Sequence, residues 1–311
     1  MGNIPERVLM MRKAWAENDA RRDAGLTEPE SLEKHRDISY GPNGTENLLD
    51  LYIPKDRSGK ATPGDCPWPV IVSIHGGGFF YGDKELYRFY CMHLAESGFA
   101  VVNFNYRLAP ESHFPAPLED TMAVMEWIAA NAKAYDLDPG NVFLVGDSAG
   151  AQLVSQFSCI MTNGAYRYLF GMKAPDIRIR AISLACGTYR FAPGEDGRPA
   201  GILLDYFGDE DLFRDPRTEI LSNITSDYPP TYIFSSYCDM LYPECEPTAE
   251  WIATRGVEVV CRIFGSPEAK EIGHVFHVNL RLPEGEKANR EQIEFFRKHI
   301  AVSGEKREEQ V

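Results

Sequence analysis

The sequence lacks several features that would each indicate a class of protein. No run of about 18 apolar residues occurs in the chain, so no segment is predicted to cross a membrane as a helix. Lysine and arginine number 32 against 46 aspartates and glutamates, and the net charge of −14 argues against nucleic acid or a membrane surface as a partner. Charged residues interrupt every apolar stretch near the N-terminus, which leaves no signal-peptide core, so we expect a cytoplasmic protein.

Cysteine also shows no pattern. The seven cysteines are scattered, odd in number and without C-x-x-C spacing. Several lie within apolar runs, where a free thiol behaves as a small core residue. The sequence therefore predicts neither a disulfide framework nor a zinc site, and we expect no metal and no cofactor.

What the sequence does contain, from residue 68 onward, is an alternation of short apolar runs and segments of helical periodicity. Continuously apolar strands that alternate with helices indicate a mostly parallel sheet covered by helices on both faces, an α/β fold. We expect strands at 37–40, 48–53, 69–74, 100–104, 142–145, 177–185, 231–237 and 257–263, and helices at 87–97, 117–132 and 292–300.

Three segments fall outside this alternation. Residues 1–34 carry apolar positions at three- and four-residue spacing among many charges, which predicts an amphipathic helical arm. Residues 188–228 are rich in aspartate, arginine, proline and aromatics, and we expect an insertion over the carboxyl edge of the sheet, where such folds bind ligands. The charged tail 303–311 is expected to be disordered.

Ser148 is the first candidate for a reactive group. It lies in Gly146-Asp147-Ser148-Ala149-Gly150, which follows the apolar run 142–145 and precedes a segment of helical spacing. A G-x-S-x-G motif acquires meaning in this strand–turn–helix context, because the tight turn holds the serine in strained geometry with its hydroxyl exposed. We therefore expect Ser148 to be a nucleophile.

A serine nucleophile needs a base to accept its proton and an acid to orient that base. In sheets of this type the acid and then the histidine follow the serine along the chain. Asp239, at the end of strand 231–237, is the expected acid, and Glu244 is the alternative further from the strand end. His274 is the expected base, and His277 in the same loop is the alternative.

The charge that develops on a substrate carbonyl oxygen needs backbone N–H donors. Ala149 supplies one at the start of its helix, where the helix dipole is positive. The glycines of 76–78 follow strand 69–74, and we expect them to turn their N–H groups inward as the remaining donors. His75 is expected to hold this loop by hydrogen bonds.

Four motifs resemble one known family, the hormone-sensitive-lipase-like esterases, which form the HGGG branch of the α/β-hydrolase fold. The resemblance extends over roughly residues 36 to 302 and rests on HGGG at 75–78, NYRLAPE at 105–111, FPAPLED at 114–120 and GDSAG at 146–150. It implies an α/β-hydrolase catalytic domain with a helical cap. The catalytic domain would comprise 36–187 and 229–302, and the cap 1–35 and 188–228.

Carried over to matching positions, the resemblance implies a catalytic triad, an oxyanion hole and two structural residues. Two positions depart from the family pattern: Val275 stands where a small residue usually follows the histidine, and the D-P-L-x-D pattern around the acid is reduced at 239–243. The implied triad is Ser148, Asp239 and His274, the oxyanion donors are Gly77, Gly78 and Ala149, and the structural residues are Arg107 and Glu119.

The expected activity is that of a serine carboxylesterase, which hydrolyses short-acyl esters, including acetyl esters of sugars, through an acyl-serine intermediate. Two alternatives are an amidase or peptidase that uses the same triad, and a non-catalytic, receptor-like ligand-binding member of the fold. The sequence leaves the oligomeric state open. The aromatic residues expected to line the substrate pocket are Phe79, Phe80, Tyr81, Tyr206 and Phe207.

Overall fold

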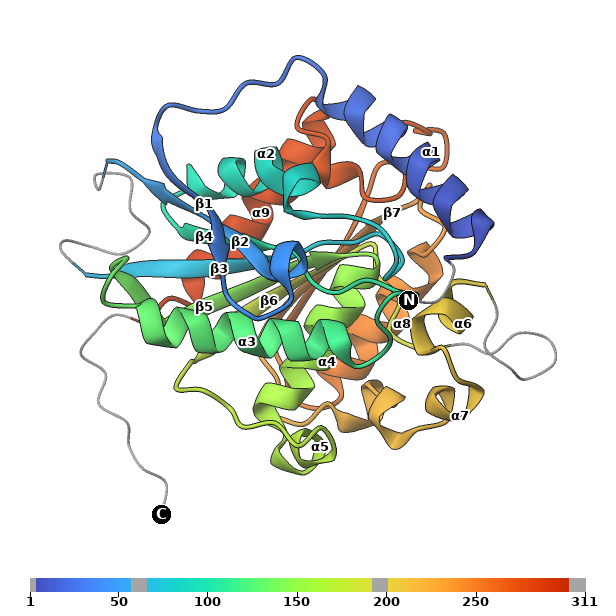
Figure 1. Ribbon diagram of the computed structural model, residues 1–311. Helices are drawn as coiled ribbons and strands as arrows, with labels where there is room; N and C mark the ends of the chain where they lie inside the picture. Colours follow the sequence, from blue (N-terminus) through green and yellow to red (C-terminus); the bar gives the residue numbers. More distant parts are fainter. Residues whose placement is uncertain (1–3, 57–65, 192–200, 302–311) are drawn as a thin grey trace.

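The computed structural model describes residues 4–56, 66–191 and 201–301, and within these ranges eight strands form one sheet (Figure 1). The strand order is β1-β2-β4-β3-β5-β6-β7-β8; β2 pairs antiparallel with β1 and β4, and the later pairs are parallel. The strands are β1 (Leu32–Ser39), β2 (Leu48–Pro54), β3 (Trp68–Ile74), β4 (Ala100–Phe104), β5 (Leu137–Asp147), β6 (Ile179–Ala185), β7 (Thr231–Ser236) and β8 (Val259–Phe264).

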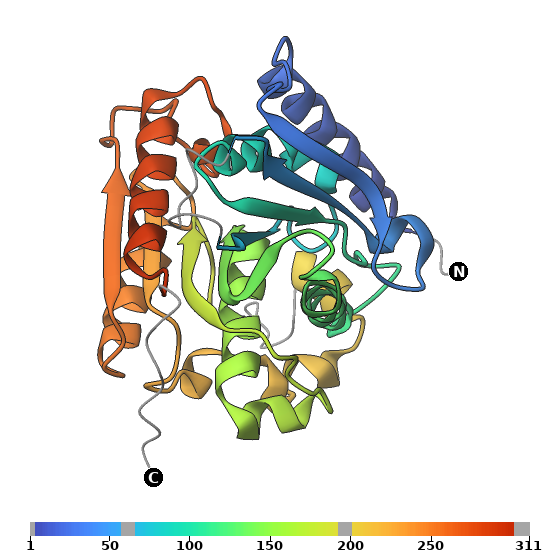
Figure 2. The same cartoon turned by 90° about the vertical axis from the view of Figure 1, so that its left-hand side faces the viewer.

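Helices cover both faces of this sheet, as the sequence pattern predicted. Figure 1 shows α2 and α9 on one side and α3 and α4 on the other, and in Figure 2 the sheet extends from β8 at one edge to β1 at the other. No helix in the described ranges combines the length and hydropathy of a transmembrane segment. The helices are α1 (Glu6–Asp23), α2 (Lys84–Ala95), α3 (Ala116–Asn131), α4 (Ala149–Thr162), α5 (Gly164–Leu169), α6 (Ile202–Phe207), α7 (Glu210–Phe213), α8 (Tyr242–Ala253) and α9 (Pro283–Lys298).

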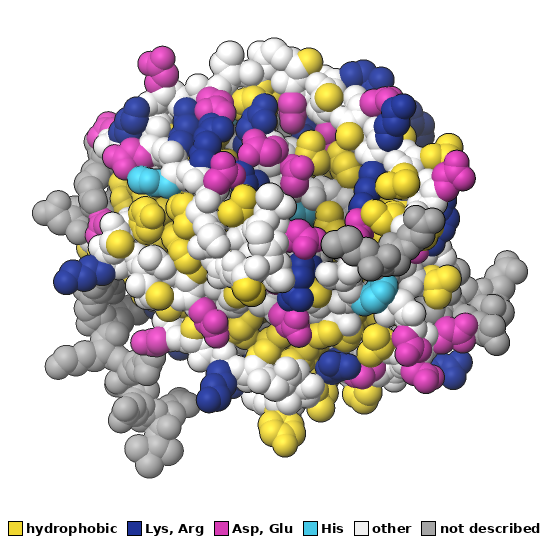
Figure 3. Space-filling view, in the orientation of Figure 1, with side chains coloured by type: hydrophobic (Ala, Val, Ile, Leu, Met, Phe, Trp, Pro, Cys, Tyr) yellow, Lys and Arg dark blue, Asp and Glu magenta, His cyan; other side chains and the backbone are white. Residues whose placement is uncertain are grey.

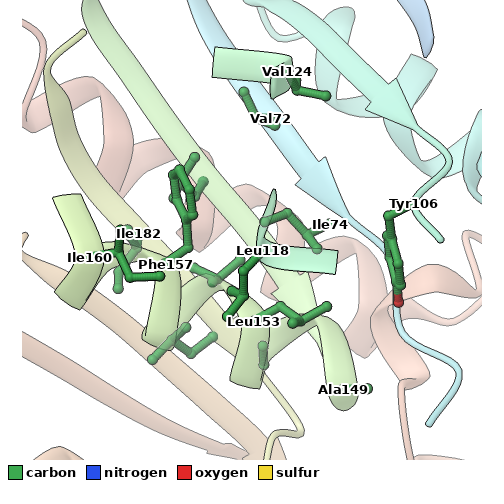
Figure 4. Packing of buried hydrophobic residues seen from close by; sticks show 14 of the residues in the cluster. Val72, Ile74, Tyr106, Leu118, Val124, Ala149, Leu153, Phe157, Ile160 and Ile182 are labelled. Atoms are coloured by element: carbon green, nitrogen blue, oxygen red, sulfur yellow. The ribbon is translucent and has the colours of Figure 1, made fainter. Parts of the chain in front are cut away.

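The alternation of side chains along β3 divides the core into two layers. Val70, Val72 and Ile74 belong to the cluster packed under α3 and α4, whereas Ile71 belongs to the cluster under α2 and α9. Figure 4 shows the first cluster, in which Leu153 of α4 lies beside residues of the strands and of α3. Burial of each such side chain contributes about 1.5–3 kcal/mol to folding.

The boundaries of several predicted elements differ from those observed, among them three at the ends of the chain. β1 begins at Leu32, so residues 32–35, assigned to the N-terminal segment from the sequence, belong to the sheet. This edge strand reads LEKHRDIS, and its largely polar composition conceals a strand pattern. α1 ends at Asp23, and α9 begins at Pro283, well before the expected residue 292. Residues 192–200 of the insertion and the tail 303–311 lie outside the described residues.

Parallel strands bring their carboxyl ends to one edge of the sheet. The loops after β3, β5, β7 and β8 leave the sheet on this edge, and they carry the glycine run 76–78, Ser148, Asp239 and His274 respectively. The topology therefore brings together residues that are far apart in the sequence; Ser148 and His274, for example, are separated by 126 positions.

Candidate active site

Ser148 occupies a strained turn between β5 and α4. Its φ of 52° and ψ of −118° are rare for a residue with a side chain. The turn is tight because the backbone of Gly150 presses against the end of β3: a Cβ on Gly150 would lie 2.0 Å from the carbonyl oxygen of Ile74. This contact explains why the motif requires glycine two residues after the serine.

The structure brings Ser148, His274 and Asp239 into one hydrogen-bonded chain. Nε2 of His274 lies 3.0 Å from Oγ of Ser148, and Nδ1 lies 2.7 Å from Oδ1 of Asp239. Because the Asp239 carboxylate accepts the Nδ1 proton, Nε2 is left unprotonated and faces the serine hydroxyl as an acceptor. These distances allow transfer of the Ser148 proton to His274.

Three donor contacts and burial define the state of Asp239. The carboxylate is almost fully buried, which by itself would raise its pKa, but the hydrogen bond and electrostatic interaction with His274, together with two further donors, outweigh burial and lower the pKa. The N–H of Leu241 and the hydroxyl of Ser235 also donate to it, at 2.9 and 2.7 Å. Asp239 is thus held as a carboxylate. Glu244, the alternative acid, lies in the first turn of α8.

The other two histidines near this edge of the sheet are buried away from Ser148. His277 packs edge-on against Tyr90 and Phe234, and burial lowers its pKa to about 3. His75 stacks on Tyr106 at a centroid distance of 4.1 Å, its Nδ1 contacts the Gly76 carbonyl oxygen, and burial lowers its pKa to about 4. Both are neutral imidazoles near pH 7, and His75 holds the loop at 76–78 as expected.

The three expected oxyanion donors all line the cavity beside Ser148. Gly77 and Gly78 have φ values of 113° and 61°, conformations that glycine adopts without strain, and both line the cavity together with Ala149. Within the described residues, the N–H groups of Gly77, Gly78 and Ala149 donate to no protein acceptor. They are therefore available to an oxygen atom placed next to the Ser148 hydroxyl.

The cavity beside the triad has a volume of about 790 Å³. Of the five aromatic residues expected to line it, Phe79 and Tyr81 do so. Phe80, Tyr206 and Phe207 do not: they are fully buried, and the ring of Tyr206 stacks behind Phe79 at a centroid distance of 4.0 Å. These three residues are core residues that support the cavity wall.

Helix α1, which lies in the segment 1–35 assigned to the cap, contributes cavity residues that the sequence did not single out. Trp15, Asn18, Asp19 and Arg22 line it, and their spacing of i, i+3, i+4 and i+7 is the signal that places them on one helix face. Tyr81 fastens this face to the glycine loop, because its hydroxyl donates to Asp19 at 2.6 Å. The loop that carries His274 also contributes, with a further polar group at Asn279.

The cavity lining also includes apolar residues. They are Phe79 and residues of the segment after β6 and of the loop after β7, namely Phe191, Ile202, Leu203, Met240 and Leu241. The lining is therefore mixed, because Thr188 and Arg190 of the same segment after β6 line the cavity as well. On the face of the molecule shown in Figure 3, basic and acidic side chains are interspersed.

Arg107 and Glu119 lie outside the cavity, in a network that ties two loops together. The Arg107 guanidinium contacts Glu119 at 2.9 Å and the buried Asp120 at 2.9 Å, and its backbone N–H donates to Asp120 at 2.7 Å. The network joins the segment after β4 to the first turn of α3. It fits the structural role that the resemblance implied.

One group of side chains in the described residues combines the donor types of a metal site: Cys186, Asp239 and His274, whose ligand atoms lie within 4.8 Å of one another. The Asp239 and His274 atoms are already joined to each other, and the second Asp239 oxygen accepts from Ser235. A metal ion bound here would break the hydrogen bond that orients His274. Metal binding at these three residues is therefore incompatible with the serine chemistry described above.

Comparisons with known proteins assign the chain to a class. Residues 71–278 match the family model described as the alpha/beta hydrolase fold, so the chain is an α/β hydrolase. Within this fold it belongs to the hormone-sensitive-lipase-like esterase family, as the four motifs predicted.

Individual relatives are similar over different lengths. The crystal structure of esterase B from Lactobacillus rhamnosis, inhibited by a tributyrin phosphonate, superposes with a TM-score of 0.82 at 27% identity and covers 94% of this chain and 96% of that chain. A probable carboxylic ester hydrolase of Mycobacterium tuberculosis, LipM, is 29% identical over 67% of this chain and 48% of its own length. Versiconal hemiacetal acetate esterase of Dothistroma septosporum is 40% identical over 30% of this chain and 28% of its own. The chain thus spans less than half the length of these two curated relatives.

Proposed function

We propose that this chain is a carboxylic ester hydrolase that acts through an acyl-serine intermediate on Ser148. The observation that carries the proposal is the hydrogen-bonded chain from Ser148 through His274 to Asp239, beside three N–H groups without a protein acceptor. The esterases among the relatives support the same activity.

In the proposed reaction, His274 takes the Ser148 proton as Oγ attacks the ester carbonyl carbon. The carbonyl oxygen becomes negatively charged and accepts hydrogen bonds from Gly77, Gly78 and Ala149. His274 then gives its proton to the leaving alcohol, and the C–O bond to that alcohol breaks. Water enters, loses a proton to His274 and attacks the acyl-serine, after which Ser148 recovers its proton and the acid leaves. Asp239 stabilises the imidazolium at each proton transfer.

The mixed cavity lining supports an ester with a short apolar acyl group and a hydroxylated alcohol. Apolar lining residues such as Phe79 and Leu203 match an acyl chain, whereas Asn18, Asp19 and Arg22 carry polar groups that match hydroxyls. Acetyl esters of sugars belong to this class, and a relative named as an acetate esterase supports the acetyl group.

The cap of this enzyme is proposed to comprise α1 and the segment after β6, since both line the cavity over the carboxyl edge of the sheet. Arg12 of α1 donates to the carbonyl oxygens of Phe80 and Ala109 at 2.7 and 2.9 Å, which supports a fixed position of this helix over the site.

The test is hydrolysis of p-nitrophenyl esters from acetate to laurate, with Ser148→Ala as control and a matched p-nitroanilide in parallel. The proposal expects turnover that is fastest for the short esters, absent in Ser148→Ala and much slower for the anilide. Anilide turnover equal to that of the ester would favour an amidase. Tight binding of an ester without any serine-dependent turnover would favour a receptor-like protein.

A further inference from the structure

One buried hydroxyl beside the site has no part in the reaction as proposed. Tyr87 lies in the first turn of α2, is nearly fully buried and contributes to the wall of the cavity. Its hydroxyl contacts two other elements at once: the glycine loop after β3, at Gly76, and the end of β5, at Asp147, the residue directly before Ser148.

The direction of both hydrogen bonds is fixed by their chemistry. The Gly76 N–H can only donate, so Oη of Tyr87 accepts it, at 3.1 Å. The single proton of the hydroxyl is then free to go to Oδ2 of Asp147, which lies 2.8 Å away. Tyr87 thus links the loop that carries two of the oxyanion donors to the strand that carries the nucleophile.

The glycine loop and the end of β5, which Tyr87 connects, are packed directly against each other. A Cβ on Gly76 would lie 2.3 Å from Oδ2 of Asp147 and 2.9 Å from its carbonyl oxygen, so the loop already rests directly on the nucleophile strand. The residue before Gly76 is held separately, because the Tyr106 hydroxyl donates to the His75 carbonyl oxygen at 2.9 Å. The Tyr87 hydroxyl therefore sets the direction in which the chain enters Gly77 and Gly78.

We propose that Tyr87 is a positioning residue for the oxyanion hole, which acts by joining the Gly76 N–H to the Asp147 carboxyl group and so aiming the N–H groups of Gly77 and Gly78 at the oxygen that becomes charged. The inference rests on the proposed ester hydrolysis. It differs from a structural role, which would affect only stability, and from a substrate contact, which would affect only binding.

The test is Tyr87→Phe, which removes the hydroxyl and keeps the ring. Tyr90→Phe is the matched control. Tyr90 lies one turn further along α2 and is also buried, and among the described residues its hydroxyl has one hydrogen-bond partner, Gln292, which donates to it at 3.3 Å. The measurements are kcat and KM for p-nitrophenyl acetate, the thermal melting temperature, and the inhibition constant of a trifluoromethyl ketone, whose adduct with Ser148 places a charged oxygen among the N–H donors.

Tyr87→Phe should lower kcat by about 10- to 100-fold, the size of effect expected from a misplaced donor. The inhibition constant of the ketone should rise by the same factor, KM should change by less than about twofold, and Tyr90→Phe should leave all three within about twofold. A lower melting temperature with unchanged kcat would overturn the proposal, and so would a change confined to KM.

Two variants of Asp147 keep the test decisive if Tyr87→Phe does not fold. Asp147→Asn retains an oxygen that accepts from Tyr87, whereas Asp147→Ala removes the acceptor, so kcat and ketone affinity should fall further in the alanine variant. Equal values in the two variants would overturn the proposal. Absence of ester turnover in the wild-type protein would instead contradict the proposed function. This outcome is measured without the variants, so it is distinct from a failure of the Tyr87 proposal.

Discussion

Replacement of Asp239 by asparagine should remove its charge and leave the orientation of His274 intact. Oδ1 receives two donors, Nδ1–H of His274 at 2.7 Å and the N–H of Leu241 at 2.9 Å, so the asparagine carbonyl oxygen belongs there. Its amide group then faces the hydroxyl of Ser235, 2.7 Å from the present Oδ2, and that hydroxyl can rotate to accept. The unprotonated Nε2 would still face Ser148.

The expected loss is therefore that of one charge beside the imidazolium that forms in the transition state. At a separation of about 4 Å and an effective dielectric constant of about 20, the attraction amounts to about 4 kcal/mol. This free energy corresponds to a decrease in kcat of about 10³-fold. Asp239→Ala removes the orientation as well, and should lower kcat by at least about a further tenfold.

The assay is p-nitrophenyl acetate hydrolysis at pH 8, with melting temperatures to confirm that each variant is folded. Glu244→Gln is the matched control at the alternative acid, and it should retain kcat within about threefold of the wild type. A value for Asp239→Asn within threefold of the wild type would refute this reasoning, as would equal values for Asp239→Asn and Asp239→Ala.

Three further changes test the stability and specificity of the site. Gly150→Ala should lower the free energy of unfolding by about 3 kcal/mol or more, because its Cβ would meet the Ile74 carbonyl oxygen at 2.0 Å; urea denaturation is the measurement. Gly164→Ala is the control and should change stability by under about 1 kcal/mol, because its Cβ would meet only the Arg167 side chain, at an ordinary contact distance of 3.7 Å. Burial raises the pKa of Asp147 from 3.8 to about 6, so the folded state binds this proton more tightly than the unfolded state and loses stability as pH rises from about 4 to about 6. Asp147→Asn has no carboxyl group to titrate at this position. Relative to the wild type, its free energy of unfolding should be higher by up to roughly 3 kcal/mol above pH 6 and by little at pH 4. Urea denaturation at both pH values is the measurement. Trp15→Ala, which enlarges the cavity at α1, should lower KM for longer esters relative to acetate, and an unchanged chain-length profile would remove Trp15 from the specificity of the site.

The arrangement of the sheet and the positions of the triad candidates could be predicted because short patterns encode them. Apolar strands separated by amphipathic helices specify a covered parallel sheet, and Ser148 stands out by its glycine two positions later, which the contact with Ile74 requires. Chain order along the same edge of the sheet then limited the acid to Asp239 or Glu244 and the base to His274 or His277. The resemblance to the family then selected Gly77, Gly78 and Ala149 among the candidate backbone donors of the oxyanion hole.

The cavity wall could not be predicted, because it depends on which side chains of neighbouring elements face each other. Phe80 and Tyr206 look like pocket residues in the sequence, because an aromatic residue gives the same sequence signal in a core and in a cavity wall. Both are buried: Tyr206 stacks on Phe79, and Phe80 packs against Trp15. The docking of α1 is a tertiary contact fixed by Arg12. The link made by Tyr87 joins three elements, and no local pattern marks it.

The most direct test of the account is covalent trapping of the nucleophile with a p-nitrophenyl alkyl phosphonate, followed by peptide mass spectrometry. The account predicts one label per chain, on Ser148, with loss of ester turnover in proportion to labelling, and neither label nor turnover in Ser148→Ala. Turnover that persists in Ser148→Ala, or inactivation by a label on another residue, would contradict it.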